Sequence, residues 1–129
     1  MYKIERKDYG VRLTFGDFIK VDEMTNWVEE SKTVLGSISG GFSVFVDMRT
    51  LKPLPKDSQA KMEEGQKFYK QSGMVRSVVI LDNSITTMQF KRIAKETGIY
   101  EWERYIDASS TPNWEEAGVK WIVDGISPD

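Results

Sequence analysis

The sequence predicts an α/β fold: a single mixed sheet of about five strands with helices, in the order ββαβαβαβα. Two strand-like segments with period-two alternation open the chain, and strand-like and helix-like segments alternate after them. Strands that alternate with helices pair in parallel through right-handed crossovers, whereas two strands joined by a short turn form an antiparallel hairpin. The 129 residues correspond to a single domain, 1–129.

The first two strands are predicted near the N-terminus, where core-facing positions alternate with polar ones. These positions are Tyr2, Ile4 and Arg6, then Tyr9, Val11, Leu13 and Phe15. Lys7-Asp8 lies between the two segments and predicts the hairpin turn, with Gly10 as a bulge.

A helix follows, with Asp22 as its expected N-cap and Gly36 as its end. Its apolar residues fall at helical spacing: Met24, Trp27, Val28, Val34 and Leu35. After Ser39-Gly40-Gly41, the nearly continuous apolar run 42–47 is typical of a strand covered on both faces.

Pro53 and Pro55 predict an ordered loop over 48–57, followed by a helix over 58–72. The inner side of this helix carries little apolar bulk: Met62, Gly65, Phe68, Tyr69 and Ser72. Because glycine costs a helix about 1 kcal/mol relative to alanine, we expect another group to approach the backbone at Gly65.

The strongest strand signal, 77–81, precedes a helix with expected caps at Asp82, Asn83 or Ser84 and an expected end at Gly98. A short edge strand is expected within 100–106. Thr111-Pro112 predicts the start of the last helix. Its buried stripe would be Trp114, Ala117, Gly118, Trp121 and Ile122.

The C-terminal part carries a family resemblance. It reads as an arginine-aromatic strand (103–107), a linker, and a helix with alanine and tryptophan (113–117, then Trp121-Ile122). This pattern, with a hairpin first, resembles the STAS fold and in particular the small bacterial SpoIIAA-like proteins, which are similar to sporulation anti-sigma-factor antagonists. The resemblance implies a regulatory module that binds a protein partner in a bacterial cytoplasm.

The resemblance also suggests regulation by phosphorylation, because such antagonists carry a serine in an Asp-Ser-Ser-Gly-like turn after the third strand. This chain has Asp47-Met48-Arg49-Thr50 at that place, which departs from the pattern. Thr50 and Ser58 are the nearby hydroxyl groups, and Ser58 is equally well explained as a helix cap.

Composition excludes several kinds of site. The chain has no cysteine and no histidine, which excludes disulfides, thiol nucleophiles and histidine general bases. A net charge of −2 gives no reason to expect nucleic acid as a partner. No export signal or bilayer-spanning run is present, so we expect a cytoplasmic monomer or homodimer without a cofactor.

Candidate site residues lie at the carboxyl ends of the predicted strands, where open parallel sheets bind ligands. Asp47, Asp82 and Asp107 end three strands, and Asn83 follows the second of them. Together the aspartates suggest either a magnesium site for phosphoryl chemistry or ordinary caps and loop ends. Arg49 is a candidate for recognising carboxylate or phosphate.

Two further candidates come from charge and aromatic content. Residues 52–76 contain six Lys or Arg against three Asp or Glu and include Tyr69, so they could face an acidic partner or a lipid headgroup. Residues 100–129 contain two Lys or Arg against seven Asp or Glu. Trp102, between two glutamates, is either an interaction anchor or part of an edge strand.

These observations leave three hypotheses. The first is a non-enzymatic regulatory or protein-binding module of the STAS-like kind. The second is a carrier of a small apolar or amphipathic, lipid-like ligand held beneath the helix 58–72. The third is a magnesium-dependent phosphoryl enzyme that uses the three aspartates.

Overall fold

The computed structural model describes residues 1–129 and contains one five-stranded sheet. The strands are β1 (Tyr2–Lys7), β2 (Gly10–Phe15), β3 (Phe42–Asp47), β4 (Met74–Leu81) and β5 (Glu103–Asp107), and they lie in sequence order across the sheet. β1 pairs antiparallel with β2, and all other neighbours are parallel. The predicted fold class and element order are therefore confirmed.

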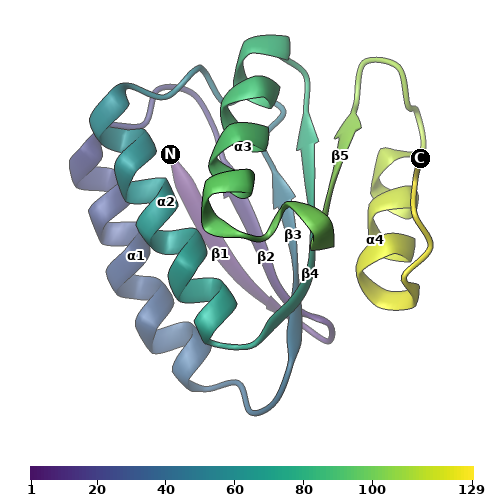
Figure 1. The fold of residues 1–129 in the computed structure, drawn as a ribbon, viewed down its shortest axis with the longest axis horizontal. Coiled ribbons are helices and arrows are strands. Elements are labelled where there is room, and N and C mark those ends of the chain that lie inside the picture. The colour runs from purple at the N-terminus through teal and green to yellow at the C-terminus, as the bar shows by residue number, and fades with distance from the viewer.

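The helices lie on both faces of this sheet (Figure 1). α1 (Val21–Gly36), α2 (Lys56–Gln71) and α3 (Ser84–Thr97) cover one face, and α4 (Trp114–Asp124) covers the other. A 3₁₀ turn, η1 (Tyr100–Trp102), precedes β5. Since neighbouring parallel strands are connected in order, right-handed crossovers place α1, α2 and α3 on the same side. α4 follows the last strand and is free of this constraint.

The sheet consequently separates two cores. The larger core lies under α1, α2 and α3, and includes Val44 and Val46 of β3. The smaller core lies under α4, and its buried members are Phe45, Val78, Ile80, Ile106, Trp121 and Ile122. β3 is buried along its whole length, as its continuous apolar run predicts.

The backbone of α2 is in close contact with Trp27 of α1. A Cβ atom at Gly65 would overlap the indole ring of Trp27, which explains why α2 carries glycine at this position. The indole stacks on Tyr69 of α2 and meets Phe15 of β2 edge-on. The close approach expected at Gly65 is thus the packing of Trp27.

Some predicted helix ends are confirmed and others are wrong. The Asn83 side chain caps α3, and Gly98 ends that helix with φ +80°. Asp22 is not the cap of α1, because the helix begins one residue earlier, after Lys20. Gly36 is still helical, and Ser37 follows it as the C-cap.

The N-terminal ends of α2 and α4 also differ from the prediction. α2 begins at Lys56, so Ser58 lies inside its first turn rather than at the cap. α4 begins at Trp114, so Thr111-Pro112 belongs to the preceding turn. Trp114 and Ala117 are half-buried, and the fully buried part of the stripe is Gly118, Trp121 and Ile122.

The hairpin turn is one residue later than predicted. Asp8 and Tyr9 form the turn, and Gly10 pairs with Lys7 as the first residue of β2. Gly10 adopts φ +143°, and a side chain there would collide with the backbone of Ser43. No helix of this fold has the length and apolarity needed to span a bilayer.

Replacing Trp121 by alanine tests the docking of α4. Trp121 is buried, and its indole Nε1 donates to the carbonyl oxygen of Ser77 at 2.9 Å. We expect Trp121→Ala to lower the free energy of unfolding by about 3–5 kcal/mol in urea titrations. The matched change Trp102→Ala, at a half-exposed ring, should lower the free energy of unfolding far less. Equal losses in the two variants would contradict the packing of α4.

The glycine substitutions Gly65→Ala and Gly36→Ala form a matched pair. Both residues are helical, but a Cβ at Gly36 meets no atom within 4 Å, whereas one at Gly65 overlaps Trp27. Gly36→Ala should raise the free energy of unfolding by up to about 1 kcal/mol. Gly65→Ala should lower it by about 1–3 kcal/mol because the core is overpacked. Stabilisation by both substitutions would show that Trp27 does not restrict α2.

Candidate functional site

The carboxyl edge of the sheet has a topological switch between β4 and β5. The chain leaving β4 enters α3 on one face, and the chain leaving β5 enters α4 on the other (Figure 1). Ligands of open α/β sheets bind in the crevice at such a switch. A hollow of about 440 Å³ lies here, and we call it the switch hollow. It is lined by Leu81, Asp82, Asn83, Ser84, Thr87, Met88, Asp107 and Ser109.

The switch hollow is acidic. Asp82 and Asp107 are both exposed, and neither forms an ion pair. Asp107 Oδ1 accepts hydrogen bonds from Oγ and N of Ser109, at 2.6 and 2.9 Å, which lower the pKa of Asp107. Asp107 therefore carries its negative charge at neutral pH.

Asn83 has a structural role in this hollow. Its Oδ1 accepts hydrogen bonds from the backbone nitrogens of Ile85 and Thr86, at 2.9 and 3.0 Å. These bonds satisfy two of the free N–H groups at the start of α3. Asp82, Asn83 and Asp107 all line the switch hollow, and the Asn83 side-chain oxygen already accepts the two hydrogen bonds that cap α3.

Exposed apolar side chains border the same edge. Met88 lines the switch hollow and is 71% exposed, and Ile85 of the same helix is 58% exposed. Phe18, which follows β2, is 75% exposed. The loop after β3 lies between these groups, since Lys52 N donates to the Asp17 carbonyl oxygen and Leu54 N to Gln89 Oε1.

Asp47 and Arg49 do not take part in the switch hollow. The Arg49 guanidinium binds both carboxylate oxygens of Asp47 at 3.0 Å and lies 4.1 Å from the ring centroid of Trp114. The hydrogen bonds that Arg49 donates to Asp47 raise the pKa of Arg49. On the same side of the sheet, Arg12 donates to Glu115 at 2.6 Å and lies 4.0 Å from Asp47. This network ties β2 and β3 to α4.

The three aspartates therefore do not converge. Asp47 belongs to the arginine network, whereas Asp82 and Asp107 line the switch hollow. The structure has no group of three or more Asp or Glu side chains that could hold a metal ion. The geometry offers no basis for the magnesium-site interpretation.

The remaining predicted positions lie elsewhere. Tyr69 is not a surface residue, because its ring is buried against Trp27 and its hydroxyl is 2.8 Å from Ser31 Oγ. Trp102 is 51% exposed in η1. Ser58 is fully buried and donates to the Ile19 carbonyl oxygen, so the folded chain does not present it for phosphorylation. Thr50 is exposed in the turn after β3.

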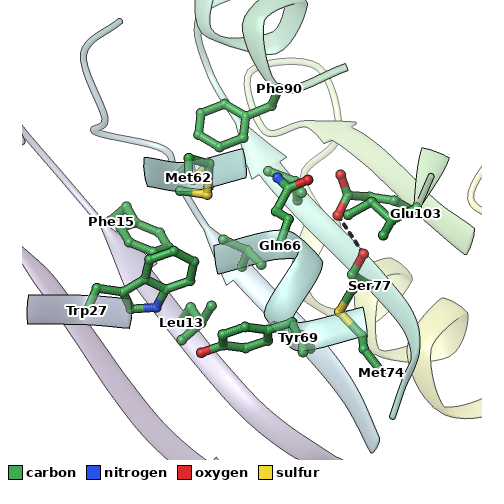
Figure 2. Close-up of a pocket in the computed structure, with 15 residues that line it drawn as sticks. Leu13, Phe15, Trp27, Met62, Gln66, Tyr69, Met74, Ser77, Phe90 and Glu103 are labelled. Carbon is green, nitrogen blue, oxygen red and sulfur yellow. Dashed lines mark hydrogen bonds between the residues drawn. The ribbon is translucent and has the colours of Figure 1, made fainter. Parts of the chain in front are cut away.

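A second hollow is internal and lies between α2 and the sheet. Figure 2 shows Trp27, Phe15 and Met62 on one side of this interior cavity and Glu103 and Ser77 on the other. Its volume is about 30 Å³, and 12 of its 15 lining residues are hydrophobic. The cavity lies where the carrier hypothesis places one. A cavity of about 10–15 Å³ admits one water molecule, so this cavity holds a few small atoms at most and no lipid chain in this conformation.

Glu103 is the functional candidate that the sequence analysis missed. Its side chain lines the interior cavity, is buried, and forms no ion pair. Its carboxyl group accepts hydrogen bonds from Ser77 Oγ and Tyr105 Oη, each at 2.5 Å. Burial raises the pKa of Glu103 to about 7, although both hydrogen bonds act in the opposite direction.

Comparison of the chain with protein-family models, with curated proteins and with solved structures found no match. The kinship with STAS domains thus stays a prediction from the C-terminal pattern and the element order.

The raised pKa of Glu103 predicts a distinctive pH dependence. Between pH 4.5 and 7 the folded chain holds a proton at Glu103 that the unfolded chain releases, so the stability falls as the pH rises through this window. From pH 5 to pH 8 we expect Glu103 to contribute a loss of about 2–3 kcal/mol in the free energy of unfolding. Urea titrations at several pH values measure it.

Two variants isolate this contribution. Glu103→Gln should lose the pH-dependent component, whereas Glu101→Gln, at an exposed neighbour, should keep it. Lys91 and Lys95 of α3 lie over the rings of Tyr105 and Tyr100 and form no ion pairs. Identical pH profiles for wild type and Glu103→Gln would show that Glu103 does not titrate in this range.

Proposed function

We propose that this chain is a non-enzymatic regulatory module that binds a protein partner at the carboxyl edge of its sheet. The main support for this proposal is the position of Met88, a strongly exposed apolar side chain beside the acidic switch hollow. Large exposed apolar side chains next to a concave polar site are a feature of protein interfaces.

The charges of this surface favour a basic partner segment. Asp82 and Asp107 line the hollow without cationic partners, and residues 100–129 as a whole carry a strong negative excess. A lysine or arginine of the partner would enter the hollow, while a neighbouring apolar side chain would pack on Met88 and Ile85. Charge complementarity of this kind speeds association and selects among partners.

The chemistry of the switch hollow also favours binding over catalysis. Asp107 has a lowered pKa and is fully exposed, which makes it a weak general base. Thr87 donates its hydroxyl to the Asn83 carbonyl oxygen at 2.8 Å, so no base activates it. The resemblance to STAS domains supports the same proposal, and with it a bacterial cytoplasmic location.

A photo-crosslinking residue in place of Met88 tests this proposal in lysate of the source cells. We expect a protein adduct that is absent when the crosslinker replaces Lys7, which lies at the opposite edge of the sheet. The adduct should weaken at least tenfold when Asp82→Lys and Asp107→Lys are added. Identical adducts from both positions, or an adduct indifferent to the two lysines, would rule out this surface.

A further inference from the structure

The starting observation is a buried carboxyl group that forms no ion pair. Glu103 is the only Asp, Glu, Lys or Arg among the residues that line the interior cavity. Burying a carboxyl group without a countercharge is unfavourable, and the group then stays protonated unless a cation arrives. Two hydrogen bonds hold Glu103 in place, yet both donors are neutral hydroxyl groups.

The other walls of the cavity suit an organic cation. Four aromatic side chains line it, from β2, α1, α2 and α3: Phe15, Trp27, Tyr69 and Phe90. Aromatic faces attract ammonium groups, most strongly where water is excluded.

We propose that the interior cavity beneath α2 binds a small aliphatic amine, held as its ammonium ion by the carboxylate of Glu103. The ammonium group would donate hydrogen bonds to Glu103. Gln66 of α2, whose amide oxygen accepts from Thr97 at 3.0 Å, also lines the cavity. The alkyl part would pack against Met62 and the aromatic rings. A cation supplied by the ligand provides the countercharge that the protein lacks.

The volume of the interior cavity and the position of α2 limit the size of this amine. A cavity of about 30 Å³ admits a group the size of methylammonium, and a longer chain requires α2 to move outward. The moving element would be α2, because its buried residues include only two large apolar or aromatic side chains, Met62 and Tyr69. Methionine side chains adapt to different occupants at low cost.

An entry route to the Glu103 end of the cavity would pass through a neighbouring hollow. A second small hollow, of about 20 Å³, shares Met74, Ser77 and Ile99 with the interior cavity. Its other lining residues include Lys70 and the half-exposed Trp102. Because Lys70 lies on this route, an anionic amphiphile is the competing occupant, and the experiment must separate the two charges.

The test compares three probes of equal chain length: n-butylamine, 1-butanol and butyrate. Each is titrated at pH 7.5 into protein with ¹³C-labelled methionine methyl groups. We expect saturable shifts of the Met62 and Met74 signals with butylamine, at an affinity at least tenfold above that for butanol. Equal affinity for the alcohol, preference for butyrate, or no saturable shift with any probe would overturn the proposal.

Variants connect the preference to Glu103. In Glu103→Gln the ratio of the affinity for butylamine to the affinity for butanol should fall at least tenfold, whereas in Glu101→Gln this ratio should equal that of the wild type. If Glu103 had a purely structural role, the substitution would weaken the binding of both probes alike and leave the ratio of their affinities unchanged. If Glu103→Gln does not fold, the comparison of the three probes on the wild-type protein still decides the proposal.

Discussion

The contact between Trp27 and Gly65 is the constraint on which the larger core depends. The indole of α1 fills the space that a side chain on α2 would take, and it is held between Phe15 and Tyr69 at centroid distances of 5.2 and 5.4 Å. One ring thus contacts α1's neighbour α2 and the sheet at the same time. Because the bulk comes from α1, α2 itself contributes few large side chains, and a space remains beside Met62.

Hydrogen bonds replace apolar packing where α2 lacks it. Ser58 donates to the Ile19 carbonyl oxygen, Gln66 accepts from Thr97, and Tyr69 pairs with Ser31. These bonds attach α2 to the loop before α1, to α3 and to α1 itself. Buried polar contacts are directional, so they define where α2 sits without the energy of a large apolar interface.

The periodicity of the sequence predicts most of the fold, because alternation and helical spacing are local. The environment of a side chain depends on contacts with residues far away in the sequence, which local periodicity does not predict. Asp47 ends β3 on the same face as Phe45, toward α4, so it meets Arg49 instead of Asp82. Glu103 occupies an edge strand, where a charged residue is ordinarily solvated, and only its alternation with Tyr105 hints that it faces the core. Asp82 and Asp107 line one hollow because their strands are neighbours.

The two carboxyl groups of β5 show that position along one strand determines the pKa of a side chain. Asp107, at the carboxyl end, is exposed and accepts two hydrogen bonds from Ser109, so its pKa is lowered and it stays charged. Glu103, at the other end, is buried, and its pKa is raised to about 7. An exposed fixed charge suits recognition of a basic surface, whereas a buried carboxyl group near neutrality responds to a cation that enters. The same strand therefore supports an outward-facing site and an inward-facing one, and the two call for different ligands.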